Sequence, residues 1–160
     1  MTAAGRRSAG ILLYRRTTEG SLEVWIAHMG GPFWARKDAR AWSIPKGEFE
    51  EGELEFDVAR REFAEEIGVP APDVAYSKLG DFRQPSGKVI TAFAAETDFE
   101  IDEVASNTFE LEWPRGSGRI QAFPEIDDAR WVSLETARDK LVKGQVAILD
   151  ALALEAAAHS

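Results

Sequence analysis

The stretch from Gly47 to Val69 constrains this chain more than any other segment, because it combines nine Asp or Glu residues with an apolar stripe. Three of its carboxylates, Glu62, Glu65 and Glu66, stand at positions i, i+3 and i+4. On a helix these offsets place the side chains on one face, where like charges ~4 Å apart repel by about 4 kcal/mol per pair at an effective dielectric constant near 20. Mg²⁺ and Mn²⁺ prefer such oxygen ligands. The stretch therefore predicts a metal-binding helix.

The sequence also marks the ends of this helix. Apolar residues recur at helical spacing from a start at Glu53 or Leu54 to an end at Ile67. Gly68 suits the left-handed conformation that often follows a last helical turn, and two prolines shortly after it prevent the helix from continuing. A solvated acidic helix face without a metal is the alternative interpretation of the same residues.

Short β-like segments surround this helix, and the chain ends in helical sequence. The expected elements are antiparallel strands at 9–16 and 22–28, two strands joined by a turn within 76–96, a strand at 126–132, and helical sequence from Ser133 or Leu134 to 158, divided near Gly144. Residues 97–120 are expected to be loop-like. No repeat or low-complexity linker is evident, so residues 1–160 are predicted to form one domain.

Composition and charge narrow the class of protein. The content of 44% hydrophobic and 29% charged residues is typical of a globular protein, and no apolar run approaches the ~20 residues needed to span a membrane. The absence of cysteine indicates a cytoplasmic enzyme. A net charge of −9 disfavours nucleic acid as a partner. The same charge repels polyphosphates at long range, a conflict that bound cations would resolve. The oligomeric state stays open.

A loop rich in cations and aromatic rings is predicted after the Gly-Gly-Pro turn at 30–32. Its basic and aromatic residues are Phe33, Trp34, Arg36, Lys37, Arg40 and Trp42. Arg36 and Lys37 could hold phosphate oxygens. Phe33 or Trp34 could stack on a nucleobase. The alternative is a solvated basic loop whose aromatic rings, Trp42 above all, belong to the core.

Two other segments carry candidate substrate contacts. Arg83 and Lys88 flank the turn at 84–87 and could contact phosphate or base, although polar residues of an edge strand explain each of them more simply. The second segment is basic and glycine-rich and could close over the substrate; it contains Trp113, Arg115 and Arg119. His28 is interpreted as a packed imidazole rather than as a catalytic group.

The acidic stretch resembles the Nudix box, G-x5-E-x7-R-E-U-x-E-E-x-G-U, in which U is a bulky apolar residue. Its fixed positions are filled by Gly47, Glu53, Arg61, Glu62, Phe63, Glu65, Glu66, Gly68 and Val69. The departure is Phe63, where the family more often has Leu, Ile or Val, and this affects only local core packing. Segments such as SAGILLYRR and FPEID also resemble bacterial Nudix NTP pyrophosphohydrolases. The fold implied is α+β, with a mixed β-sheet sandwiched between helices (α/β/α).

The resemblance implies a metal site on the predicted helix. Glu62 and Glu66 would be the principal ligands of Mg²⁺ or Mn²⁺. Glu65 and the backbone carbonyl of Lys46 would share the same coordination shell. The ammonium group of Lys46 would also be available to a phosphate of the substrate.

Further roles are implied outside the metal ligands. Arg61 would hold Glu53 in a salt bridge that fixes the loop before the helix. In the family, another catalytic or metal-binding glutamate often precedes a Trp within a strand. Glu125, six residues before Trp131, is the match, and Asp127 competes with it. The candidates for the general base, in order, are Glu125, Glu65 and Glu62.

The reaction implied is metal-dependent hydrolysis of a pyrophosphate bond in a nucleoside diphosphate linked to another moiety. The Pro45-Lys46-Gly47 context resembles the branch that acts on dinucleoside polyphosphates, so such a compound or an NTP is the leading expectation for the small-molecule substrate. Two alternatives stay open, an RNA 5′-end pyrophosphohydrolase and a non-catalytic nucleotide-binding regulator. The acidic surface disfavours the first, and the complete box disfavours the second.

Overall fold

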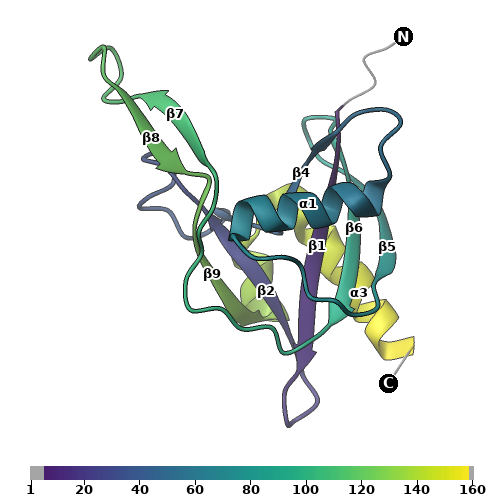
Figure 1. The fold of residues 1–160 in the computed structure, drawn as a ribbon. Coiled ribbons are helices and arrows are strands. Elements are labelled where there is room, and N and C mark those ends of the chain that lie inside the picture. The colour runs from purple at the N-terminus through teal and green to yellow at the C-terminus, as the bar shows by residue number, and fades with distance from the viewer. Residues whose placement is uncertain (1–5, 159–160) are drawn as a thin grey trace.

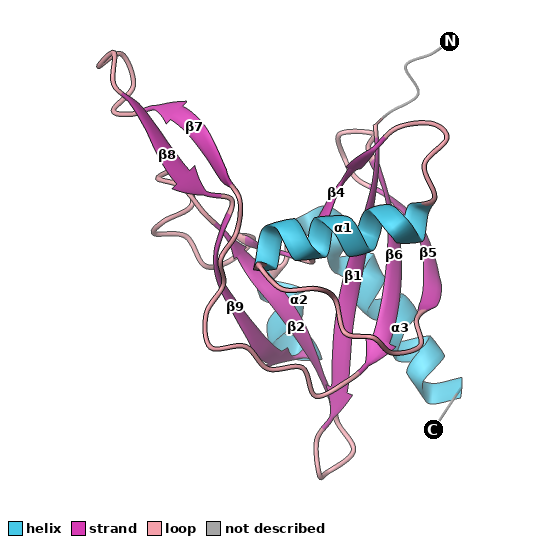
Figure 2. Cartoon of the chain, in the orientation of Figure 1, coloured by secondary structure: helices cyan, strands magenta, loops and turns pink. Residues whose placement is uncertain are grey.

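The computed structural model describes residues 6–158, which form nine strands, three α-helices and one short 3-10 helix (Figures 1 and 2). In chain order these are β1 (Arg7–Arg16), β2 (Leu22–Met29), β3 (Trp42–Ser43), β4 (Lys46–Phe49), α1 (Glu55–Ile67), β5 (Ser77–Arg83), β6 (Val89–Glu96), β7 (Thr108–Glu112), β8 (Ile120–Pro124), β9 (Ile126–Ser133), α2 (Leu134–Lys140), η1 (Lys143–Gln145) and α3 (Val146–Ala158). No helix within this range combines the length and apolar content required to span a bilayer.

The main sheet is mixed, and two different strands pair with successive halves of one edge of its central strand, β1. Its order is β3-β2-β1-β6-β5, with β4 also pairing with β1 and β9 also pairing with β2. The first half of β1, Arg7–Gly10, pairs with β4, whereas its second half, Leu13–Arg16, pairs with β2. A Cβ atom at Gly10 would lie 2.7 Å from the carbonyl oxygen of Pro45, so only glycine allows the chain to approach so closely at this division.

Helices cover both faces of the sheet, as the sequence predicted. Along β1, Ala9, Ile11 and Leu13 pack in the cluster that contains Phe63 of α1, while Leu12 packs in the opposite cluster with α3. This alternation follows from the two-residue period of a strand, which sends successive side chains to opposite faces. The predicted α/β/α arrangement is confirmed.

The predicted limits of the acidic helix agree with α1 to within two residues at its start and are correct at its end. Gly68 has φ of 97° and its N–H donates to the carbonyl oxygen of Ala64, which closes the helix in the left-handed manner expected of glycine. The other expected elements, the hairpin β1–β2, the pair β5–β6 and the C-terminal helices divided near Gly144, are also present.

Two elements differ from the sequence prediction. Residues 97–120 were expected to be loop-like, but β7 and β8 form a two-stranded antiparallel hairpin that projects from the body of the molecule (Figure 1). The segment Lys46–Phe49, which overlaps the start of the acidic stretch, forms the strand β4. Its Lys, Gly and Glu residues have low intrinsic strand propensity, so the pairing with β1 is what makes this segment extended.

Candidate functional site

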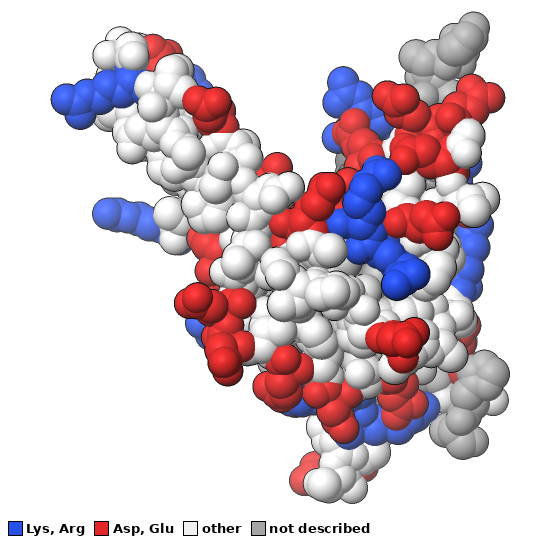
Figure 3. Space-filling view, in the orientation of Figure 1, with Lys and Arg blue, Asp and Glu red and all other residues white. Residues whose placement is uncertain are grey.

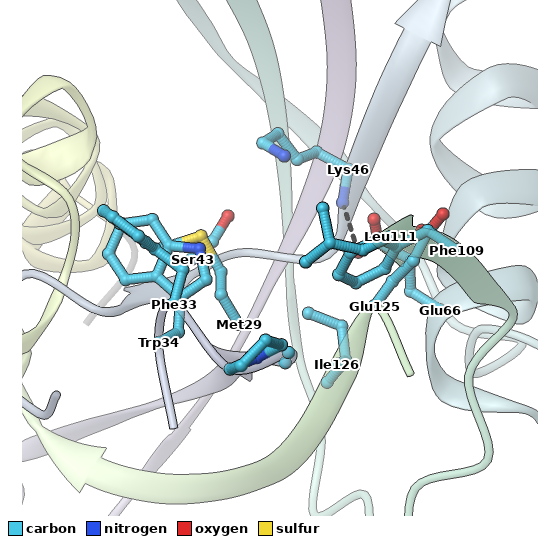
Figure 4. A pocket seen from close by; sticks show the side chains of 13 residues that line it. Met29, Phe33, Trp34, Ser43, Lys46, Glu66, Phe109, Leu111, Glu125 and Ile126 are labelled. Atoms are coloured by element: carbon cyan, nitrogen blue, oxygen red, sulfur yellow. Dashed lines mark hydrogen bonds between the residues drawn. The ribbon is translucent and has the colours of Figure 1, made fainter. Parts of the chain in front are cut away.

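A cavity of about 480 Å³ lies between the loop that follows β2, the end of α1 and the base of the β7–β8 hairpin (Figure 4). Its lining residues come from five separate segments of the chain: Met29, Gly30, Gly31, Pro32, Phe33, Trp34, Ser43, Lys46, Glu66, Phe109, Leu111, Glu125 and Ile126. Glu66 and Glu125 lie at one end of the cavity, together with Phe109, and the rings of Phe33 and Trp34 lie at the other end. A mainly apolar cavity with a few convergent polar groups is typical of a small-molecule site.

Glu66 forms the buried part of the acidic end. Its side chain is oriented by the backbone N–H of Lys46, which donates to Oε1 over 3.1 Å, the dashed bond in Figure 4. Burial raises the pKa of Glu66 from 4.5 to about 7, against the lowering effect of the Lys46 charge and of this hydrogen bond, while Glu125 and Glu62 raise it further. A carboxylate held in this way gains stability from a cation.

Glu62 lies directly against Gly47, the first residue of the box. A Cβ atom at position 47 would lie 2.0 Å from Oε1 of Glu62, so the glycine provides the space that the carboxylate occupies. Burial raises the pKa of Glu62, the nearby charge of Glu65 raises it further, and Arg61 opposes both. Glu65 itself is exposed on the same helix. The box glycine is therefore required to seat a carboxylate as well as to shape the backbone.

Arg61 and Glu53 form the ion pair that the family resemblance implied. Nη1 of Arg61 donates to Oε2 of Glu53 over 2.7 Å, and the N–H of Glu50 donates to Oε1 of Glu53 over 2.9 Å. The Arg61 hydrogen bond lowers the pKa of Glu53, and the same bond raises the pKa of Arg61. The pair connects the loop before α1 to the middle of the helix, as expected.

The acidic end can hold a divalent cation, because its donors are carboxylate oxygens. Burial and neighbouring carboxylates disfavour their negative charge, which a cation would neutralise. Among residues 6–158, no three His, Cys, Asp or Glu side chains converge into a ready-made coordination shell. Glu66 instead accepts from the N–H of Lys46, and Glu62 lies 3.6 Å from Nε of Arg61.

Glu125 and Asp127 take different positions although only one residue separates them. Glu125 lines the cavity, and its carbonyl oxygen accepts from the N–H of Gly30 over 2.8 Å. Asp127 does not line it and instead lies 2.7 Å from Nδ1 of His28, whose Nε2 lies 2.7 Å from the carbonyl oxygen of Lys37. Of these two candidates, Glu125 is the one placed at the cavity, and His28 is a packed imidazole as predicted.

The aromatic end is formed by the loop at 30–37. Phe33 and Trp34 meet edge to face with their ring centroids 4.9 Å apart, and Nζ of Lys37 lies 3.6 Å from the centroid of Phe33. Phe33 is 62% exposed, whereas Trp34 packs against the core. Trp42 is a core residue, as expected, with its indole N–H donating to Asp38. Phe33 is thus the more exposed of the two rings of this loop that line the cavity.

Four predicted substrate contacts lie outside the cavity lining, namely Arg36, Lys37, Arg83 and Lys88. Arg36 is exposed on the same loop as Phe33 but does not line the cavity. Arg83 and Lys88 lie at the β5–β6 turn, where Nζ of Lys88 pairs with Glu48 over 3.2 Å. The antiparallel register of β5 and β6 places this turn beyond the outer end of β4, away from the cavity. Contact of these residues with substrate stays a prediction.

Sequence reasoning missed the wall that the hairpin contributes. Phe109 and Leu111 of β7 line the cavity, and a Cβ atom at Gly31 would lie 2.7 Å from the ring of Phe109. The alternation of apolar and charged residues in TFELE was a signal for a strand with one apolar face. Its contact with the loop at 30–34 depends on chain segments about 75 residues apart, which no local pattern encodes.

Comparison with known proteins agrees with this geometry. The NUDIX domain family matches residues 4–152. An RNA pyrophosphohydrolase from Bartonella henselae is 30% identical over 147 residues, covering 82% of this chain and 78% of the relative. The Ap4A hydrolase of C. elegans in a binary complex has a TM-score of 0.58 at 21% identity, covering 96% of this chain and 98% of that one.

A third comparison concerns a ligand complex. The NUDIX domain of Shewanella oneidensis NrtR, solved with ADP ribose, has a TM-score of 0.65 at 15% identity, covering 97% of this chain and 90% of that one. The two structural similarities show the fold, and the family match over most of the chain identifies the class of enzyme. This chain belongs to the Nudix family of pyrophosphohydrolases.

Proposed function

We propose that this enzyme, as a single domain over residues 1–160, hydrolyses a pyrophosphate bond in a nucleoside diphosphate linked to another moiety, with dinucleoside polyphosphates and NTPs as the leading substrates. One observation carries the proposal. A single cavity of about 480 Å³ has the box carboxylate Glu66 and Glu125 at one end and the exposed ring of Phe33 at the other. That volume suits one nucleoside with its phosphates.

The proposed cofactor is Mg²⁺ or Mn²⁺, held by Glu62 and Glu66 with Glu65 and the carbonyl of Lys46. When bound, the cation neutralises phosphate charge and makes water a better nucleophile at neutral pH. The raised pKa values of Glu62 and Glu66 support this assignment, because burial disfavours the charge of both carboxylates more than Arg61 and Lys46 offset it.

The remaining residues position the substrate and move the proton. Phe33 stacks on the nucleobase, and the ammonium group of Lys46, a residue of the cavity lining, binds a phosphate oxygen. Water attacks one phosphorus, the bridging P–O bond breaks, and the proton of the water passes to the carboxylate of Glu125. Arg61 and Glu53 support the site without contacting the substrate.

A second candidate substrate is the 5′ end of RNA. It is favoured by the Bartonella henselae relative, which is an RNA pyrophosphohydrolase and is 30% identical to this chain. It is opposed by the net charge of −9, which weakens long-range attraction to a polyanion. Both candidates place a terminal nucleotide in the same cavity and differ only in what continues beyond it.

The test is a substrate panel assayed with Mg²⁺ and with Mn²⁺. It contains diadenosine polyphosphates, NADH, ADP-ribose, NTPs and RNA carrying a 5′-triphosphate, with Glu66→Gln as the inactive control. We expect the highest kcat/KM for a diadenosine polyphosphate or an NTP. Preference for the RNA would move the assignment to the second candidate, and absence of hydrolysis across the panel by the wild-type protein would overturn both.

A further inference from the structure

The β7–β8 hairpin continues the cavity wall well beyond the space that one nucleotide fills. Phe109 and Leu111 line the cavity at the base of the hairpin. The hairpin then projects away from the body and leaves a V-shaped hollow between itself and the α1 side of the molecule (Figure 3). The outer part of the hairpin therefore lies beyond the cavity lining and faces this hollow.

The pairing of β7 with β8 shows which side chains lie on the face of the hairpin that lines the cavity. Phe109 pairs with Phe123 and Leu111 with Gln121, and the N–H of Trp113 donates to the carbonyl oxygen of Arg119 over 2.9 Å. Because side chains alternate along a strand, Phe109, Leu111 and Trp113 share one side, with Arg119 opposite Trp113. At ~3.4 Å per residue, Trp113 lies roughly 14 Å farther out than Phe109.

The outer end of this face carries an aromatic ring and free positive charge. Trp113 is 39% exposed. Among the described residues, neither Arg115 nor Arg119 forms an ion pair with a carboxylate, and Figure 3 shows the basic side chains at the end of the hairpin. Other described arginines, such as Arg36 and Arg83, also lack an ion pair, so this end is distinguished by the position of Arg119 next to the exposed ring of Trp113.

The hairpin has a second side that lacks these features. Ile120 is 61% exposed, and its partner Glu112 accepts a hydrogen bond from the N–H of Gly118 in the hairpin turn. Glu110 also belongs to this side by register. Aromatic and cationic groups therefore concentrate on the side that continues the cavity, and acidic groups on the other.

We propose that Trp113 and Arg119 form a distal subsite for the second nucleotide of the substrate, with Trp113 stacking on its base and Arg119 binding its anionic oxygens. This rests on the proposed function, because the first nucleotide must occupy the cavity. The second nucleotide belongs either to a dinucleoside polyphosphate or to an RNA chain. The two share the chemistry that the hairpin offers, a flat base next to negative charge.

The test compares substrates that differ in length for the wild-type protein, Trp113→Ala and Arg119→Ala. ATP represents one nucleotide, and diadenosine tetraphosphate and a 5′-triphosphorylated RNA trinucleotide represent the longer substrates. The quantity compared is the ratio of KM for each longer substrate to KM for ATP. We expect Trp113→Ala to raise this ratio by about 5- to 150-fold for at least one longer substrate, which is the effect of losing one stacked base, with kcat much less affected.

Controls separate recognition from damage to the hairpin. Ile120→Ala alters the opposite side of the same ribbon and should keep the wild-type ratio. Trp113→Phe retains an aromatic face and should restore most of the loss seen with Ala. Arg119→Ala should reduce the salt dependence of KM for the longer substrates, because it removes an ionic contact.

The outcomes divide clearly. A raised ratio for the RNA alone assigns the subsite to RNA, and one for diadenosine tetraphosphate alone assigns it to the dinucleotide. A ratio within twofold of wild type for both variants and both long substrates overturns the subsite. If the wild-type protein hydrolyses none of the three compounds, the leading substrates of the proposed function are wrong, and calorimetric binding of the same compounds to wild type and Trp113→Ala then decides the subsite alone.

Discussion

Replacing Glu66 by Gln should make the metal-free protein more stable at alkaline pH while removing most of its activity. Glu66 is 8% exposed, and its pKa rises from 4.5 to about 7, mainly because of burial. At ~1.36 kcal/mol per pH unit, this shift corresponds to about 3 kcal/mol. Gln keeps the oxygen that accepts from the N–H of Lys46 and carries no charge.

The direction of the pH dependence follows from which state binds the proton. Between pH 4.5 and about 7 the folded protein keeps the Glu66 proton while the unfolded chain has lost it, so stability contributed by this group is present below pH 4.5 and falls as pH rises to about 7. The difference in unfolding free energy, Glu66→Gln minus wild type, should therefore increase by about 3 kcal/mol between pH 4.5 and pH 8.

The assay is urea unfolding in a chelator at several pH values, followed by the same series with Mg²⁺. Glu65→Gln, which alters an exposed carboxylate on the same helix, is the matched control and should show little such increase. Mg²⁺ should stabilise wild type more than Glu66→Gln, because a cation that binds only the folded protein adds its binding free energy. A pH-independent difference would refute the burial argument. Equal stabilisation of both proteins by Mg²⁺ would refute the ligand assignment.

Other substitutions test the supports of the site. Gly47→Ala would place a methyl group 2.0 Å from Oε1 of Glu62, so kcat should fall roughly 100-fold with little change in the unfolding midpoint, measured by steady-state kinetics and thermal unfolding; unchanged kcat would contradict the crowding. Arg61→Ala removes the 2.7 Å bond to Glu53 and should lower kcat/KM by about 10- to 100-fold, with partial recovery in Arg61→Lys; full activity of Arg61→Ala would argue against a positioning role. Ser133→Ala deletes the N-cap of α2 and should cost about 1 kcal/mol of unfolding free energy at unchanged kcat, and no loss would show that the cap is dispensable.

The helix and its carboxylates could be predicted from sequence because their signals are local. The apolar stripe, the terminal Gly68 and the spacing of Glu62, Glu65 and Glu66 all lie within four turns of one helix. The fold followed from the same stretch through the family resemblance and was confirmed. The aromatic loop could also be predicted, because its turn residues and rings are adjacent in the sequence. In the structure its Phe33 is exposed and lines the cavity.

Glu125 was preferred to Asp127 through the family resemblance, because the strand pattern itself does not distinguish the two residues. Residues two apart on a regular strand share a face, so the alternation of side chains treats them alike. In the structure the register with β2 shifts, since Ile126 pairs with Met29 but Asp128 pairs with His28. The additional residue at this bulge is Asp127, and the bulge directs it to His28.

The hairpin wall was missed for a different reason. A two-stranded ribbon is marginal by itself, and β7–β8 is ordered by contacts at its base, where Gly30 and Gly31 admit Pro124 and Phe109 within distances that no side chain would tolerate. The sequence predicted a turn at Gly30 and Gly31, but it did not predict that the hairpin would fill the space next to these glycines. Long-range packing of this kind leaves no periodic trace in either segment.

The projecting hairpin has a consequence for how this enzyme can diversify. Its outer residues belong to neither of the two clusters of buried side chains, so substitutions there cost little folding free energy. The carboxylate helix, in contrast, packs through Phe63 into one of those clusters and tolerates few changes. Mutation can therefore explore new substrates along the ribbon while selection for a folded, reactive centre acts elsewhere, and relatives that cleave the same bond can differ in the molecules they accept.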